Sequence, residues 1–328
     1  MKKLTYSGGE EYRNKPENLD PRDLKLFQHE FQKQIFDSHV YGLSNVYLLG
    51  KNTIRIKNSK LYLKHTYMSR PPLKNIIKVI LRFFQQRRKK VKNIDSGVWI
   101  INNKSENYFH WMTESLTRVL SFQKLNKELK VLLPEQFTRF EFVLKTFDML
   151  GIDYQIYSSD NLVRVNNLYL TSHTAPAGNY NSKIILELHS KLNNGSKSVS
   201  GKRLWLSRKF SDRRYLSNED ELIPMLKKYD IEIIYPEHLT YSQQIEIFRK
   251  AEFIGGVAGA ALVNMLYMET NKKVLELRTN NDELNNCHYS LAVLLKHKYF
   301  YEKCKSDADE NLSVDVQSLD NTLRTIFL

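Results

Sequence analysis

Hydrophobic and polar positions follow two different periods along the chain. In residues 46–65 apolar and polar residues alternate around two turn-like segments, 50–52 and 58–59. This alternation is typical of antiparallel strands joined by tight turns. From Gly97 onward, short apolar runs alternate with segments of helical period, including helices expected from Asn107 and over 137–150. We therefore predict an N-terminal β-meander followed by α/β structure.

The alternation becomes regular beyond residue 202. Apolar runs in RLWLS, IEIIY, EFIGG and KVLEL are separated by helical segments in NEDELIPMLKKY, SQQIEIFRKA and AGAALVNMLYM. Strands and helices in turn predict a parallel sheet covered on both faces, which binds ligands beyond the carboxyl ends of its strands. The polar segment 193–202 is the best linker candidate. We expect domains of residues 1–195 and 196–328, with the last helix packing back on the first domain.

Small residues stand where the third of these strands turns into a helix: Gly255, Gly256, Gly259 and Ala260. They let a ligand approach the backbone, and the first helical turn offers unpaired N–H groups to an anion. Close packing of a helix on a strand uses the same residues, so the glycines alone do not distinguish a ligand site from close packing. Glu276 should end the next strand at the same edge, where a carboxylate can accept both hydroxyls of a ribose. The combination predicts a nucleotide, with its phosphates at Gly259 and its sugar at Glu276.

Basic residues gather around the first strand of this second half. They are Lys202, Arg203, Arg208, Lys209, Arg213 and Arg214, against the single acid Asp212. Arg208 follows the strand and should project from the carboxyl edge, where its planar guanidinium can grip a phosphate in two places. We predict Arg208 as a phosphate ligand, with Arg213 or Arg214 beside it. A solvated basic loop is the alternative for the last two.

The stretch ENYFHWMTESLTRVL, residues 106–120, predicts an amphipathic helix with Asn107 as its N-cap. His110, Glu114 and Arg118 are spaced four residues apart and should form one polar stripe. A histidine beside a carboxylate can hold a sugar hydroxyl and accept its proton. For an isolated helix, an ordinary polar face with weak ion pairs is the alternative.

Taken in this order, the motifs of the chain resemble glycosyltransferase family 61. The motifs are NYFHWMTESLTR, then TAPAGNY (174–180), then LSRKFSDRRYLSNE, GVAGAALVN and VLEL, and the resemblance covers residues 40–300. It implies a GT-B fold, in which two Rossmann-like domains face each other across a cleft. It also implies sugar transfer with inversion from a nucleotide sugar, UDP-linked, to a glycan or lipid-linked glycan in capsule or other polysaccharide synthesis.

The resemblance also implies roles for individual residues. Glu114 acts as the base, or His110 assisted by it, while Asn107 and Arg118 lie on the acceptor side. The donor side comprises Arg208, Arg213, Arg214, Gly256, Gly259, Ala260, Asn264 and Glu276. Because no Asp-x-Asp motif is apparent, we expect protein cations to neutralise the leaving diphosphate, with no metal and no cofactor.

Two positions depart from the family pattern. Ala258 stands where the family has a histidine before Gly-Ala, and Glu114 stands where it has an aspartate. Glu114 keeps the charge on a longer arm. Ala258 leaves open an altered donor, or a sugar-nucleotide binder without catalytic activity.

A net charge of +14 indicates an anionic partner, which can be a nucleic acid, a membrane surface or a phosphorylated ligand. Residues 72–93 carry eight Lys or Arg and no acid, with Lys74, Lys78 and Arg82 one turn apart. The apolar face of this segment comprises Ile76, Ile77, Ile80, Leu81, Phe83 and Phe84. We expect this helix to lie on an anionic bilayer, a solvated basic end of a core helix being the alternative. A nucleic acid ranks last among these partners, because the basic residues do not alternate with aromatic residues along one face.

The expected location is the cytoplasm, with peripheral attachment to the inner face of the membrane. The first twenty residues lack the apolar stretch of a secretory signal, and no uncharged run approaches the ~20 residues that span a bilayer. The two cysteines, Cys287 and Cys304, form neither a metal-spaced pair nor a disulfide framework, which suits a reducing compartment.

Overall fold

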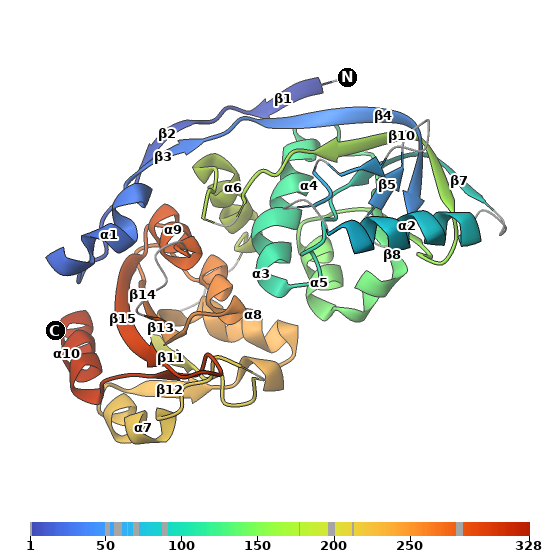
Figure 1. Ribbon diagram of the computed structural model, residues 1–328. Coiled ribbons are helices and arrows are strands. Elements are labelled where there is room, and N and C mark those ends of the chain that lie inside the picture. The colour runs from blue at the N-terminus through green and yellow to red at the C-terminus, as the bar shows by residue number, and fades with distance from the viewer. Residues whose placement is uncertain are drawn as a thin grey trace. The chain divides into compact units, whose positions relative to one another are not determined.

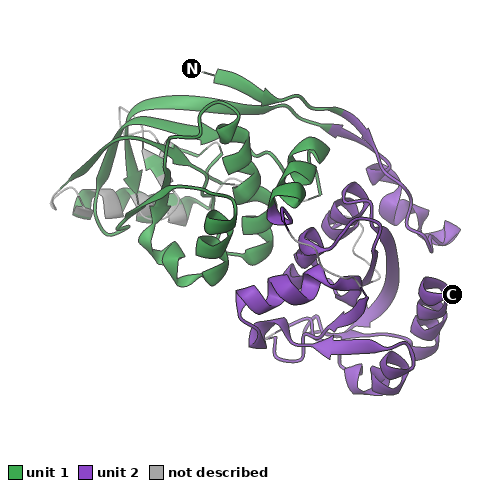
Figure 2. Ribbon diagram, turned by 180° about the vertical axis from the view of Figure 1, so that it is seen from behind, with its two compact units in different colours: residues 1–9, 35–191 green, residues 10–34, 192–328 purple. Residues whose placement is uncertain are grey.

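A computed structural model describes residues 2–49, 53–55, 61–63, 65–67, 72–86, 91–176, 178–195, 201–211, 213–279 and 285–328. The chain is mixed α/β and forms two compact units, as Figure 2 shows. The first unit contains residues 1–9 and 35–191, and the second contains residues 10–34 and 192–328. The change of unit after residue 191 falls at the start of the predicted linker, of which residues 196–200 lie outside the described part.

The assignment of residues 10–34 to the second unit differs from the predicted boundary. This segment carries β2 (Gly9–Tyr12), the short helix α1 (Leu24–Phe27) and β3 (Gln32–Ile35). The ring of Phe27 lies edge-on to Tyr289, with 5.2 Å between ring centroids, and Arg13 donates to Ser290 at 2.8 Å. These contacts join residues far apart in the sequence, so no local pattern indicates them.

The first unit is built on a mixed sheet in the order β6-β5-β4-β10-β7-β8-β9, with β1 beside β4 (Figure 1). Its strands are β1 (Lys2–Tyr6), β4 (Ser38–Leu49), β5 (Thr53–Arg55), β6 (Leu61–Tyr62), β7 (Lys92–Trp99), β8 (Val131–Pro134), β9 (Tyr154–Tyr157) and β10 (Val163–Thr171). The pairings of β4 with β5 and of β5 with β6 are antiparallel, which confirms the predicted meander in the described residues. Strands β10, β7, β8 and β9 run parallel, so their carboxyl ends share one edge.

The helices of the first unit include the one predicted from Asn107. That helix consists of α3 (Tyr108–His110), the π-helical turn η4 (Trp111–Ser115) and α4 (Leu116–Gln123). The others are α2 (Leu73–Gln86), the 3₁₀ turn η5 (Glu135–Arg139), α5 (Glu141–Met149) and α6 (Ser182–Leu192). Every residue of α4 from Leu116 to Phe122 is buried, so this helix lies in the core.

The second unit has a sheet in the order β12-β11-β13-β14-β15-β16, parallel except for the last pair. Its strands are β11 (Lys202–Leu206), β12 (Ile231–Ile234), β13 (Ala251–Val257), β14 (Lys273–Thr279), β15 (Lys298–Ser306) and β16 (Leu312–Ser313). Besides α1, its helices include α7 (Glu219–Lys228), α8 (Tyr241–Arg249), the 3₁₀ helix η7 (Ala260–Tyr267), α9 (Cys287–Leu294) and α10 (Val316–Phe327). The predicted alternation of strands and helices is confirmed.

Helix α10 buries its apolar face in its own unit, and its packing on the first domain stays a prediction. Leu319, Leu323 and Ile326 join the buried cluster around Trp205. Its Ser318 donates a hydrogen bond to Glu302 of β15 at 3.0 Å. The helix therefore completes the core of the second unit.

Candidate active site

The candidate catalytic helix begins with the predicted cap. The side-chain oxygen of Asn107 accepts hydrogen bonds from the backbone N–H groups of Phe109 at 3.0 Å and His110 at 3.4 Å. The helix then widens into the π-helical turn η4, a feature that occurs frequently at functional sites. The capping role of Asn107 is confirmed, and its acceptor-side role stays a prediction.

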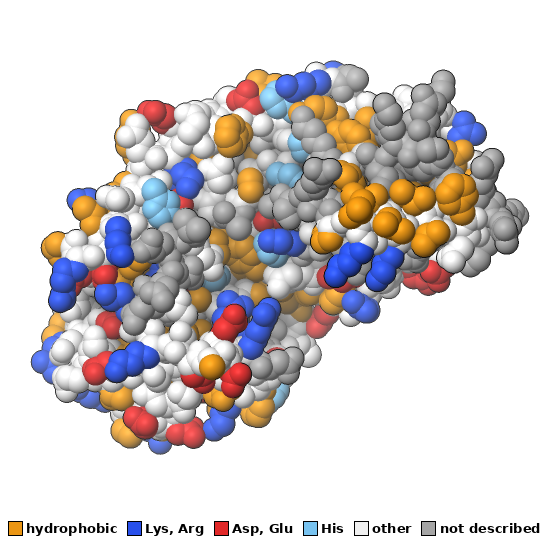
Figure 3. Space-filling model, viewed as in Figure 1, with side chains coloured by type: hydrophobic (Ala, Val, Ile, Leu, Met, Phe, Trp, Pro, Cys, Tyr) orange, Lys and Arg blue, Asp and Glu red, His pale blue; other side chains and the backbone are white. Residues whose placement is uncertain are grey.

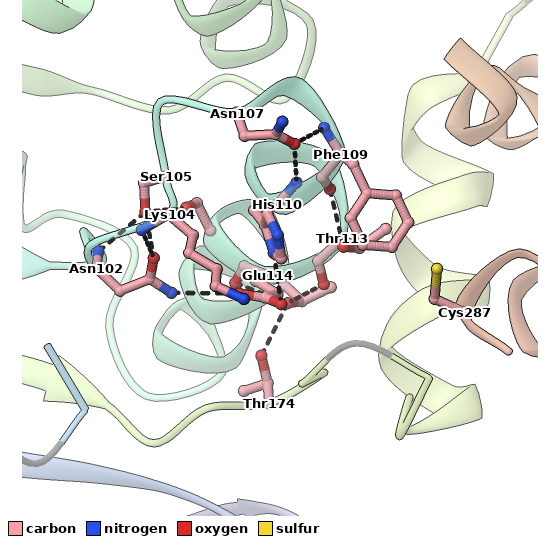
Figure 4. A network of polar contacts seen from close by, with 12 residues as sticks. Asn102, Lys104, Ser105, Asn107, Phe109, His110, Thr113, Glu114, Thr174 and Cys287 are labelled. Atoms are coloured by element: carbon pink, nitrogen blue, oxygen red, sulfur yellow. Dashed lines mark hydrogen bonds and ion pairs between the residues drawn. The ribbon is translucent and has the colours of Figure 1, made fainter. Parts of the chain in front are cut away.

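Glu114 lies in the π-helical turn and is 2% exposed. One carboxylate oxygen lies 2.9 Å from Nδ1 of His110, and the other accepts from Nδ2 of Asn102 at 3.2 Å (Figure 4). Asn102 is itself held by Ser105, whose hydroxyl lies 2.9 Å from the backbone nitrogen of Asn102. A buried carboxylate must be paired in this way, and the pairing holds it in one orientation. The predicted contact between His110 and Glu114 is confirmed.

His110 and Glu114 differ in their access to solvent. The side chain of His110 is 16% exposed, whereas both oxygens of Glu114 already have partners. A carboxylate at Nδ1 favours the tautomer with the proton on Nδ1, which leaves Nε2 with a lone pair. The geometry can therefore place a base at His110, with Glu114 holding its ring and tautomer.

Arg118, which the sequence predicts on a solvated polar stripe with His110 and Glu114, is buried inside the unit. Its guanidinium is fully buried and donates to the carbonyl oxygens of Ile100 and Thr171, each at 2.9 Å, and to Oγ1 of Thr171 at 3.1 Å. Burial lowers the pKa of Arg118 to about 9, and the charge of Glu114 partly opposes this shift. Glu114 is buried as well, so the predicted polar stripe does not face solvent.

We expect Arg118→Met to lower the free energy of unfolding by about 3–5 kcal/mol, because buried carbonyl groups at the ends of β7 and β10 lose a charged donor. Urea denaturation of the purified variant measures this change. Arg139→Met, at an exposed arginine of the same unit, serves as the control and should shift stability little. An unchanged stability, with a raised KM for the acceptor, would instead favour the acceptor-side role.

His173 and Thr174 were missed as site residues, although TAPAGNY begins at Thr174. They follow β10, whose Leu170 pairs with Trp99 of β7, so they share an edge of the sheet with Asn102. The hydroxyls of Thr174 and Thr117 lie 2.8 Å apart, and Nε2 of His173 lies 3.1 Å from the carbonyl oxygen of Tyr67. Burial and the charge of Arg118 lower the pKa of His173 to about 4, which keeps this imidazole neutral.

In the second unit, the structure brings Arg208 and Gly259 together. A Cβ atom at Gly259 would lie 2.2 Å from Nη1 of Arg208, so any other residue would require the guanidinium to move. Arg208 donates to the carbonyl oxygens of Arg214 at 3.0 Å and Arg213 at 3.2 Å. The predicted meeting of these residues at the carboxyl end of β11 and the turn after β13 is confirmed.

The charge balance at this arginine cluster suits an anion. Burial lowers the pKa of Arg208, and the neighbouring charges of Arg214 and Arg213 add to this effect, while Glu237 opposes it. An added phosphate would relieve the repulsion among the three guanidinium groups.

The other small residues of the turn have packing roles. A Cβ atom at Gly256 would meet the carbonyl oxygen of Leu206 at 2.7 Å, which the approach of β13 to β11 explains. The segment after Gly259 is a 3₁₀ helix, in which Ala260 is half-buried and Asn264 is fully buried. Contacts of Gly256, Ala260 and Asn264 with a donor stay predictions.

Glu276 does not end its strand, contrary to the prediction. It lies in the middle of β14 and is 1% exposed. One carboxylate oxygen lies 2.8 Å from Nδ1 of His288, and the other accepts from the hydroxyl of Tyr299 at 2.5 Å. Although burial acts to raise it, the neighbouring His288 holds the pKa of Glu276 below its usual value. The carboxylate therefore joins α9 and β15 inside the unit and does not stand at the sheet edge to receive a ribose.

Metal and cysteine chemistry can be assessed for the described part of the chain. There, no three or more His, Cys, Asp or Glu side chains form a group able to hold a metal ion. Cys287 and Cys304 are both free and buried. Independence from metal stays a prediction.

Comparison with known sequences identifies the family. The sequence model described as Glycosyltransferase 61 matches residues 108–275, about half of the chain. The chain therefore belongs to the glycosyltransferase 61 family. The matched range includes both His110 with Glu114 and Arg208 with Gly259.

One relative is the EGF domain-specific O-linked N-acetylglucosamine transferase of Drosophila melanogaster. It is 34% identical to the chain over 98 residues, which cover 29% of this chain and 18% of the relative. The similarity thus spans a small part of the relative's length.

Proposed function

We propose that the protein is an inverting glycosyltransferase that moves a hexose or pentose from a UDP-linked donor to a glycan or lipid-linked glycan. Its pathway is the synthesis of a capsule or other polysaccharide in the cytoplasm. The observation that carries the proposal is the buried Glu114 bonded to the partly exposed His110, within the residues that match the family. In the GT-B arrangement we propose, two Rossmann-like units present this pair and the Arg208 cluster to the same substrates.

In the proposed reaction, Nε2 of His110 takes the proton from an acceptor hydroxyl. The hydroxyl oxygen then forms a bond to the anomeric carbon from the face opposite the leaving group, which inverts the configuration. Glu114 keeps the proton on Nδ1 and stabilises the imidazolium that forms. The alternative, in which Glu114 is itself the base, requires its carboxylate to release a partner first.

The leaving group is a nucleoside diphosphate, which departs with the electrons of the bond to the anomeric carbon. Its developing charge is stabilised by Arg208, by Arg213 or Arg214, and by backbone N–H groups after Gly259. This arrangement supports catalysis without a divalent ion.

A screen of nucleotide sugars by thermal shift, followed by hydrolysis and transfer assays, tests the proposal. UDP-N-acetylglucosamine is the first donor to try, because the relative's name contains this sugar. Transfer with an inverted anomeric configuration supports the proposal. Binding without turnover would identify a silent sugar-nucleotide binder, the alternative that Ala258 suggests. Failure to bind any nucleotide sugar would overturn both.

We expect activity to persist after treatment with EDTA, because arginines can neutralise the departing diphosphate. Initial rates measured before and after chelation, and again after adding manganese, check this. A control enzyme with an established metal requirement must lose activity under the same treatment. Loss of activity that manganese restores would contradict the prediction.

A further inference from the structure

Helix α2 exposes a continuous apolar face. Leu73, Ile77, Ile80, Leu81 and Phe84 are each between 43% and 71% exposed. Their spacing places them on one side of the helix. Figure 3 shows them as a row of orange side chains over α2. Scattered apolar residues are ordinary on a protein surface, whereas a contiguous patch marks an interaction site.

Another side of the helix packs on the first unit. Helix α2 lies against β4, and Ile76, which borders the row on the side away from Lys74 and Lys78, is half-buried. The side chains of Arg82 and Phe83, which the sequence placed on this helix, lie outside the described part. The helix thus packs on its own unit while the row stays exposed.

Basic side chains border the exposed row. Lys74 and Lys78 are exposed, lie one turn apart and follow its edge, where Figure 3 shows blue side chains. No Asp or Glu occurs in α2, and the sequence continues with Arg87, Arg88, Lys89 and Lys90. An apolar row with cations along its edge complements a surface that is apolar inside and anionic outside.

We propose that α2 docks this protein on an anionic lipid bilayer. The helix lies in the plane of the interface, with the exposed row in the headgroup and acyl boundary and Lys74 and Lys78 on lipid phosphates. In the described residues, no helix is both long enough and apolar enough to cross a bilayer. The proposed attachment is by adsorption of α2, and it is independent of the transfer reaction proposed above.

Co-sedimentation with vesicles tests the docking. The protein should bind vesicles of phosphatidylcholine with phosphatidylglycerol, bind phosphatidylcholine alone much less, and release as ionic strength rises. Lys74→Gln with Lys78→Gln should weaken binding about 30-fold, since each cation near the surface contributes about fivefold. Lys127→Gln with Lys130→Gln removes the same charge from exposed lysines elsewhere in the unit and should leave binding nearly unchanged.

A variant within the exposed apolar row tests the other half of the docking surface. Ile80→Ser should weaken vesicle binding several-fold, whereas Ile156→Ser, at a residue of β9 that is equally exposed at 43%, should not. Circular dichroism must show that each variant is folded. The proposal is overturned if the wild-type protein ignores anionic vesicles at low salt, or if control and α2 variants lose binding alike. It is also overturned if the face instead pairs with a second copy, seen as a dimer that Ile80→Ser dissociates without any binding to vesicles.

Discussion

Glu114→Gln is expected to lower kcat by about 10²–10⁴-fold while leaving the protein folded. Glutamine keeps the length of the side chain, and its oxygen can still accept from Asn102. Its amide nitrogen, however, would face Nδ1 of His110 and favour the tautomer with the proton on Nε2. Initial rates at saturating donor and acceptor measure the loss, and thermal unfolding checks the fold.

A matched set of variants shows whether His110 and Glu114 act as a unit. His110→Gln should lower kcat by a similar factor, and the double variant should be no slower than the slower single one. Glu128→Gln, an exposed residue of the same unit, removes the same charge and should retain full activity. If His110→Gln kept its rate while Glu114→Gln lost it, Glu114 would be the base. If the fold losses in kcat of the two single variants multiply in the double variant, the two residues act separately.

Arg208→Met is expected to lower kcat/KM by about 10²–10³-fold, because the departing diphosphate loses its half-buried cation. Arg208→Lys keeps the charge without the planar fork, so its kcat/KM should lie between those of Arg208→Met and the wild type. Steady-state kinetics with a varied nucleotide sugar, together with the product nucleotide as inhibitor, measures the effect on donor binding and on turnover.

Two further variants separate the position of this charge from its mere presence. Gly259→Ala should also slow the reaction, because the added methyl would meet Nη1 of Arg208 and displace the guanidinium. Lys202→Met removes a cation from the amino end of the same strand, β11, where it pairs with Glu232, and should be nearly silent. Equal losses of kcat/KM in Lys202→Met and Arg208→Met would mean that long-range charge alone explains the effect. That result would contradict a phosphate site at Arg208.

Much of the fold follows from the order of residues along the chain. A parallel strand buried on both faces must be a short apolar run, so β11, β12, β13 and β14 are visible in the sequence. The start of α3 is visible because a cap uses only neighbouring residues, and Asn107 occupies that position. The contact between His110 and Glu114 is likewise local, four residues apart on one helix.

Other parts of the site depend on geometry that no local pattern carries. Arg118 is buried because the whole of α4 lies in the core, and Glu276 is buried because β14 continues past it to Thr279. His173 comes near Arg118 because β10 pairs with β7 across a long stretch of sequence.

The sequence by itself thus determined the α/β class, the family and the local pairs, because periodicity, caps and motifs involve residues within a turn or two of one another. The tertiary structure alone decided which polar side chains are buried, and it placed residues 10–34 in the second unit. The physical reason is that burial and strand register arise from contacts between distant segments, and a single chain read in order does not contain those distances.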